Sequence, residues 1–416
     1  MGFGSSFNGG GGEFSGDSDL RLETGYLKVA ATTEATSFSG FYFDDGAALW
    51  LIRNAVGGTV THVPASRSFR LNIGTGATDN IIRQTLRVFP YFAGNVQSLS
   101  FGLLWLLQNS ANLESGYGDD NNGIFFLVQK SAGGVNSISL VRRSDASGSI
   151  VTDTIPQASW NVDKLDGTGI SGITLDLTKG QMFMMDWTWY GFGSITWSLR
   201  INGKNHLVHR LLGGNNLTQP LLGEPNQAIR HRIFNSAATA GTSFIQVSGI
   251  DLRSAGVDST QRSSFSRSTP FPVTSKTLAT VTTFVLMSIR PKIVYKTRNN
   301  RGQLKLSRIW MSGTGSGIWA LVFNPVLTGA VFADVDINNS FCDFDVAATA
   351  FTGGAVIYSG AFASSGGGGN LEFNVPRTTD PIAPFSDFSA TNIVSLVFRT
   401  TSASVMQFGF NWEEFI

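Results

Sequence analysis

The segment from residue 176 to residue 210 constrains the fold of this chain most strongly, because large apolar side chains recur there at every second position. In an extended strand, one face would carry Phe183, Met185, Trp187 and Trp189. A second alternating run covers residues 194–199, and Asn202-Gly203 soon follows it. This dipeptide is a strong hairpin signal because both turn positions need a positive φ. The segment therefore predicts three consecutive β-strands joined by tight turns.

Similar strand-like runs recur every 8–14 residues between about residues 20 and 253. Outside the first segment they cover residues 26–31, 49–53, 68–73, 81–88, 96–105, 123–129, 137–142, 150–155, 229–234 and 243–251. Short strands at this spacing, without a helical repeat, predict an all-β fold with two large antiparallel sheets, as in a β-sandwich or jelly roll. We assign residues 20–253 to this first domain.

Two further regions are predicted on its C-terminal side. Residues 254–275 shift to Ser, Thr, Arg and Pro, which is typical of a linker. Residues 276–416 are predicted to form a second β-sandwich domain. Its strand-like runs cover residues 280–290, 304–310, 318–324, 341–349, 356–362, 393–400 and 405–412.

Residues 1–19 are rich in Gly and Ser, which predicts a flexible arm that cannot bury enough apolar area to fold alone. Three phenylalanines, Phe3, Phe7 and Phe14, are spaced through this arm. Two interpretations follow from them: a disordered tail, or an arm that contacts a neighbouring subunit through these rings.

The composition excludes several functional classes. A net charge of +1 provides no general attraction to nucleic acid or to an acidic membrane, and no apolar run approaches about 18 residues. Charged residues make up 14% of the chain, below the roughly 25% of typical soluble domains, which suits either burial against other subunits or a neutral lectin. The single cysteine, Cys342, excludes an intrachain disulfide and is expected to be a buried thiol. The N-terminus lacks the pattern of a secretory signal, so we expect synthesis in a cytoplasm.

Acidic and basic motifs offer candidate sites, each with a simpler structural explanation. Asp119, Asp120 and Asn121 form a weak candidate for a calcium site or, alternatively, a solvated hairpin turn. His206 and His209 should point to opposite faces of a strand, which does not favour a shared metal. A basic run over residues 292–308 predicts a hairpin tip that contacts a phosphate backbone or an acidic patch on another subunit. No metal or other cofactor is predicted.

Catalytic motifs are missing from the sequence. Asp186 is the one acid in a strongly apolar run, but no partner carboxylate can be named for glycoside hydrolysis, so we expect it to be a buried structural residue. Trp187, Trp189, Tyr190 and Trp197 would form a sugar-stacking platform if they were exposed, although their alternation favours the core. The chain is therefore predicted not to be an enzyme.

An ordered series of motifs around Gln84 to Arg210 resembles virion structural proteins of tailed bacteriophages. The motifs are residues 82–85, 119–126, 140–144, 160–167 and 171–179, followed by the aromatic hairpin, and the second half is similar in style at 288–290 and 324–330. This resemblance implies a concanavalin-like β-sandwich followed by a second β-rich domain, and it supplies no catalytic residue. It also implies a place among head-decoration, fibre or tail components.

Three functional hypotheses follow from the residues and the resemblance together. The first is a non-enzymatic virion structural protein, made in the host cytoplasm, that packs as a homo-oligomer on other capsid or tail subunits. The second is a carbohydrate-binding adhesion module of a virion fibre, which would bind a host-surface glycan. The third is a polysaccharide depolymerase. Exposed tryptophans in a groove would favour the second hypothesis, and two carboxylates about 5–10 Å apart in a cleft would favour the third.

Overall fold

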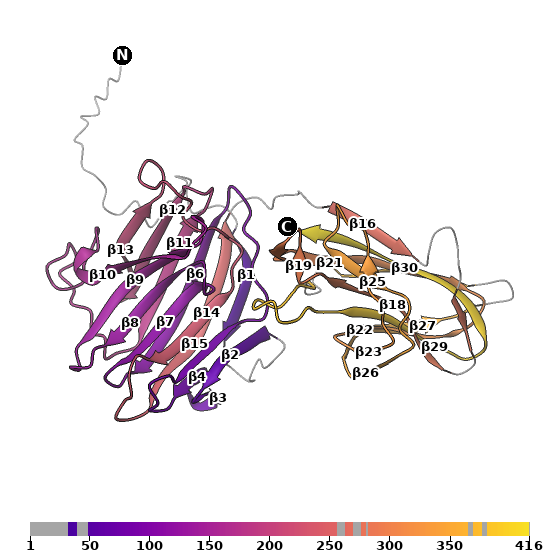
Figure 1. Cartoon of the computed structure of the whole chain (residues 1–416), viewed down its shortest axis with the longest axis horizontal. Helices are drawn as coiled ribbons and strands as arrows, with labels where there is room; N and C mark the ends of the chain where they lie inside the picture. Colours follow the sequence, from indigo (N-terminus) through magenta and orange to yellow (C-terminus); the bar gives the residue numbers. More distant parts are fainter. Residues whose placement is uncertain are drawn as a thin grey trace, which may run out of the picture.

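The computed structural model describes residues 32–39, 49–255, 263–268, 276–279, 282–364, 369–376 and 381–415. Within these ranges the chain folds almost entirely into antiparallel β-sheets, which form two sandwiches joined side by side (Figure 1). The predicted all-β class with antiparallel sandwich architecture is confirmed. Phe3, Phe7 and Phe14 lie outside the described residues.

The first sandwich consists, within the described ranges, of an eight-stranded and a seven-stranded sheet. The eight-stranded sheet contains, in spatial order, β13 (Lys204–Leu212), β12 (Ser194–Ile201), β11 (Gln181–Thr188), β6 (Val96–Leu106), β15 (Ser243–Ala255), β4 (Ser68–Ile73) and β3 (Gly58–Val63), with β1 (Thr32–Ser39) also beside β15. The seven-stranded sheet contains β10 (Val151–Pro156), β9 (Asn136–Ser144), β8 (Gly123–Lys130), β7 (Ala111–Gly118), β14 (Ile229–Asn235), β5 (Asn80–Thr85) and β2 (Trp50–Val56). Two short 3₁₀ turns are η2 (Pro64–Ser66) and η3 (Gln157–Ser159).

The second sandwich pairs a five-stranded sheet with a six-stranded one in the part of the chain that the structure describes. The five-stranded sheet contains β16 (Ser263–Ser268), β30 (Ser404–Phe415), β21 (Gln303–Gly313) and β28 (Gly369–Asn374), with β17 (Lys276–Leu278) also beside β30. The six-stranded sheet contains β24 (Ala333–Asp334), β25 (Cys342–Asp345), β18 (Thr283–Pro291), β29 (Val394–Thr400), β22 (Gly317–Phe323) and β27 (Ala355–Phe362). Two small ribbons pair β19 (Val294–Tyr295) with β20 (Arg298–Asn299), and β23 (Val326–Thr328) with β26 (Ala350–Thr352). The segment 254–275, which we predicted as a linker, contributes β16 to this sandwich.

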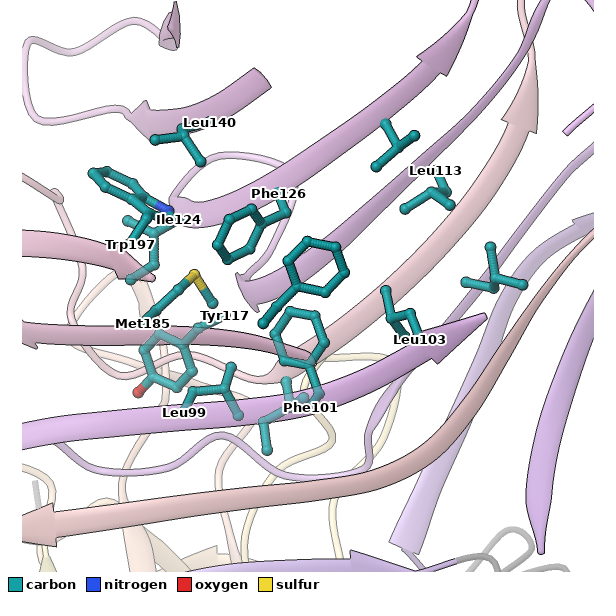
Figure 2. Packing of buried hydrophobic residues seen from close by; sticks show 14 of the residues in the cluster. Leu99, Phe101, Leu103, Leu113, Tyr117, Ile124, Phe126, Leu140, Met185 and Trp197 are labelled. Carbon is teal, nitrogen blue, oxygen red and sulfur yellow. The ribbon is translucent and has the colours of Figure 1, made fainter. Parts of the chain in front are cut away.

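The aromatic segment forms three consecutive antiparallel strands, β11, β12 and β13, as predicted. Its large side chains fill the core of the first sandwich, where Phe183, Met185 and Trp197 are fully buried. Figure 2 shows Met185 and Trp197 facing Ile124, Phe126 and Leu140 of the opposite sheet. The alternation of apolar residues in this segment thus indicates which side chains lie between the two sheets.

Strand β7 is the central strand that the sequence pattern did not reveal, because it reads Ala-Asn-Leu-Glu-Ser-Gly-Tyr-Gly. It is nevertheless completely buried. Arg143 donates to Glu114 at 2.8 Å, which compensates this buried carboxylate. A Cβ atom on Gly118 would lie 2.6 Å from the Phe125 ring, so only glycine leaves room for that ring.

Cys342 is a free, buried cysteine in the second core, as expected. Burial raises the pKa of its thiol well above the usual value, and the neighbouring carboxyl of Glu414 adds to this effect. The thiol therefore stays protonated and behaves as a small apolar group.

Candidate functional site at the junction of the two sandwiches

The acidic loop after β7 and the basic hairpin of the second sandwich, two motifs identified separately in the sequence, meet each other in the structure. Arg301 donates to the carboxylate of Asp119 at 2.5 Å, across 182 positions of the chain. Both side chains are mostly buried, with 11% and 14% of their surfaces exposed. The basic hairpin thus contacts an acidic patch, and that patch belongs to the first sandwich of the same chain.

The guanidinium of Arg301 has several further partners on the first sandwich. It donates to the backbone oxygen of Asn226 at 2.7 Å and to the side-chain oxygen of Gln227 at 3.3 Å. The carboxylate of Glu224 lies 3.9 Å from its Nε atom. On the side of the second sandwich, the guanidinium lies 5.0 Å from the centre of the Phe388 ring. This planar, multivalent arrangement suits arginine and not lysine.

A loop between β28 and β29 makes a second set of contacts between the sandwiches. The Ser386 backbone amide donates to the Leu86 oxygen at 2.7 Å, and its hydroxyl donates to the Thr85 oxygen at 2.6 Å. The Gln84 side chain donates to the same hydroxyl at 2.7 Å. Gln303 donates to the Val88 oxygen, also at 2.7 Å. These contacts extend the polar junction along β5 and the residues that follow it.

Of the three candidate calcium ligands, the two carboxylates, Asp119 and Asp120, are engaged in contacts within the chain. The second oxygen of Asp119 accepts the backbone amides of Asn121 and Asn122, each at 2.7 Å, which shapes the loop. Asp120 accepts from the buried Arg230 at 2.6 Å and lies 3.4 Å from Arg53. Burial alone would raise the pKa of Asp120, but the charge and hydrogen bond of Arg230 outweigh it, so the pKa is lowered. Among the described residues, no cluster of three His, Cys, Asp or Glu side chains is arranged to hold a metal ion.

The aromatic candidates divide into core and surface residues. Trp187 and Trp197 are buried in the core, and Trp187 lies 4.6 Å from the Tyr117 ring centre. Trp189 is half-buried and donates from its indole nitrogen to the Leu222 oxygen at 2.9 Å. Tyr190 is 58% exposed in the turn between β11 and β12. Of these four residues, Tyr190 is the one whose ring is available to a ligand.

Asp186 and the histidine pair differ from our predictions. Asp186 lies on the face of β11 that points away from the core, where it is half-buried and not fully enclosed. His206 and His209 share one face, because a β-bulge at Val208 pairs them with Leu199 and Trp197, two core-facing residues. The backbone amide of Asn161 donates to His209 at 3.2 Å, which gives this ring a structural partner.

Several residues of the junction had no signal in the sequence. Glu224, Asn226, Gln227, Ser386 and Phe388 lie in irregular segments, and nothing in their local pattern predicts a partner. Only the opposite charges of the acidic loop and the basic run could have indicated that these two motifs meet.

The fold and the junction define an all-β protein of two sandwiches joined by a partly buried ion-pair network. No protein family matches this sequence, and no curated protein matches it. Solved structures with some similarity include a Bacillus licheniformis β-glucanase, at 11% identity and TM-score 0.36, covering 55% of this chain and 100% of that one. They also include a legume lectin-like domain from Entamoeba histolytica, at 10% identity and TM-score 0.33, covering 54% and 98%.

A third similar structure is the CBM2 module of the evolved Dit of Lactobacillus casei BL23 phage J-1, at 9% identity and TM-score 0.37, covering 55% of this chain and 99% of that one. At these levels of similarity, no function transfers to this chain. No helix among the described residues is long and apolar enough to span a membrane.

Replacing Arg301 by alanine should weaken the junction between the sandwiches. Its loss leaves Asp119 partly buried without its cation, at a cost of about 1–4 kcal/mol, between the values for exposed and buried pairs. Chemical denaturation should show this decrease in the free energy of unfolding, together with a less cooperative transition. The variant Arg301→Lys should retain only part of the free energy that Arg301→Ala loses. The matched control Arg308→Ala removes an exposed ion pair with Glu372 and should have little effect. Equal losses in both alanine variants would contradict a role for the junction.

Glu224→Gln should stabilise the protein at neutral pH and have no effect at low pH. Burial raises the pKa of Glu224, and the nearby charge of Arg301 only partly offsets this. The pKa of Glu224 in the folded state thus lies above its unfolded value of about 4.3. The contribution of Glu224 to the free energy of unfolding is therefore complete below that value and is lost as pH rises. Glutamine does not ionise, so the variant does not lose this contribution. Denaturation at pH 7 and pH 4 should show the difference at pH 7 only, and a pH-independent difference would contradict it.

Proposed function

We propose that this chain is a non-enzymatic structural protein of a tailed-bacteriophage virion that packs as a homo-oligomer on capsid or tail subunits. The observation that carries the proposal is the contact between the acidic loop and the basic hairpin, centred on Arg301 and Asp119. The charged motifs with the greatest potential for ligand chemistry bind each other and join the sandwiches into one building block. The sequence resemblance to virion proteins supports the same assignment.

An apolar surface on the first sandwich supports assembly with other subunits. Leu104 and Leu106 of β6 alternate with core residues and therefore lie on the outer face of the eight-stranded sheet, where they are 40% and 50% exposed. Met182 of the neighbouring strand β11 lies on the same face and is 38% exposed. Exposed apolar groups that share a surface are typical of protein contacts. In a chain with few charges, this surface is a suitable subunit interface.

Leu106→Asp should reduce both self-association and incorporation into virus particles. A carboxylate on the outer sheet face would have to be desolvated at the subunit contact, which costs several kcal/mol. Light scattering after gel filtration gives the oligomer mass, and mass spectrometry of purified particles gives incorporation. The control Val135→Asp places the same charge on an exposed hairpin turn, where Val135 is 68% exposed. A wild-type monomer that is missing from purified particles would refute the proposal.

Glycan binding is the second candidate function, and it is favoured by the turn between β11 and β12. Tyr190 has a φ of 37°, a strained value for an aromatic residue, and such strain is typical of functional positions. Its ring is exposed close to Phe192, which is 45% exposed. Exposed rings provide an apolar face and a polar tip, both of which suit a sugar ring.

If the chain binds glycans here, Tyr190→Ala should lower the affinity at least tenfold. The stacking face would be lost while the fold remains, since Trp189 keeps its hydrogen bonds to Tyr91 and Leu222. A glycan array with the wild type identifies the sugar, and titration of that sugar then compares the variants. Tyr295→Ala, in the second sandwich, serves as the control. An array without any binding would eliminate this second function.

A further inference from the structure

An apolar cleft of about 430 Å³ lies between the two sandwiches, beside the polar junction. Both sandwiches contribute to its walls, which include Phe38, Leu86, Phe89, Leu306, Phe323 and Ile357. Its polar lining is small and contains no carboxylate. A concave apolar site of this size at a domain boundary is typical of a binding pocket. It suits large apolar side chains, and the charged residue in its lining is the cation Arg87.

The chain itself contains a segment with this chemistry, at residues 1–19. Phe3, Phe7 and Phe14 are separated there by small residues, so each ring can enter a cleft without steric interference from its neighbours. The charged residues of this segment are Glu13, Asp17 and Asp19, all acidic. Apolar rings with a few acidic neighbours therefore match an apolar cleft that has no carboxylate.

We propose that the cleft is the docking site of residues 1–19 of its own chain, with the phenylalanine rings as the inserted groups. This inference does not depend on the virion assignment. It concerns an intramolecular contact, whereas the outer sheet face around Leu106 concerns contacts between subunits.

The reach of the chain favours docking within one molecule. Phe38 lines the cleft and Thr32 lies six residues earlier in β1, which corresponds to about 20 Å along the strand. Residues 20–31 connect Thr32 to the docking segment, and twelve residues reach at most about 40 Å. That reach exceeds the distance along β1, so the segment is tethered within range of its own cleft and has an advantage in effective concentration over that of a neighbour.

The test uses the full-length protein and a labelled synthetic peptide of residues 1–19. The protein variant Phe3→Ser, Phe7→Ser, Phe14→Ser should leave the cleft unfilled, and it should bind the peptide with one-to-one stoichiometry. The wild-type protein should bind at least tenfold more weakly, because its own segment competes. A peptide with the same three serines should not bind. Fluorescence anisotropy of the labelled peptide measures binding in each of these three experiments.

A bulky substitution in the wall locates the site. Ile357→Trp, added to the triple-serine protein, should abolish peptide binding, whereas the control Ile318→Trp, on an exposed position outside the cleft, should leave it unchanged. The proposal is overturned if the triple-serine protein does not bind the peptide, as when another segment or ligand fills the cleft. It is also overturned if wild type and variant bind equally, or if Ile357→Trp has no effect. Oligomer mass is a separate measurement, so failure here leaves the proposed function standing.

Discussion

The arrangement of the two sandwiches depends on a polar junction centred on one partly buried guanidinium, that of Arg301. It joins Asp119, Asn226 and Gln227 of one sandwich to the hairpin of the other. An ion pair removed from water gains little net energy, because desolvation offsets much of the attraction. Removing one partner is costly, however, since the other charge then remains partly buried and uncompensated. The pair therefore specifies how the two cores meet more than it stabilises either of them.

This junction also helps to hold the acidic loop in shape through contacts within the chain. In Asp119, one oxygen receives two backbone amides of its own loop, and the other receives Arg301. Both oxygens of this carboxylate thus accept hydrogen bonds, one from the loop and the other from the second sandwich. The carboxylate of Asp120 likewise accepts a hydrogen bond from Arg230 and forms an ion pair with Arg53. Residue types that suit calcium in a sequence can equally be the ligands of arginines that are distant in the chain.

Features of this chain that depend on local interactions can be predicted from the sequence, and features that depend on contacts distant in the chain cannot. Alternation is local, so the three strands of the aromatic segment and the burial of Trp197 could be predicted from it. Strand β7 was missed because its Glu114 is acceptable in a sheet centre only with Arg143, which lies on another strand. The shared face of His206 and His209 was missed because one bulged residue reverses the alternation. The junction itself was missed because its partners are separated by 182 positions.

The distribution of charge connects the junction to the apolar surfaces. A chain with only 14% charged residues nevertheless buries Arg230, Glu114 and Glu414, which takes charge away from an already weakly charged exterior. These buried groups have specific partners, as when Glu414 accepts from Ser340 and Trp412. The exterior also carries exposed apolar side chains, among them Leu104 and Leu106. Covering such a surface with another protein would remove apolar area from water, and this is the favourable term that the proposed assembly would gain.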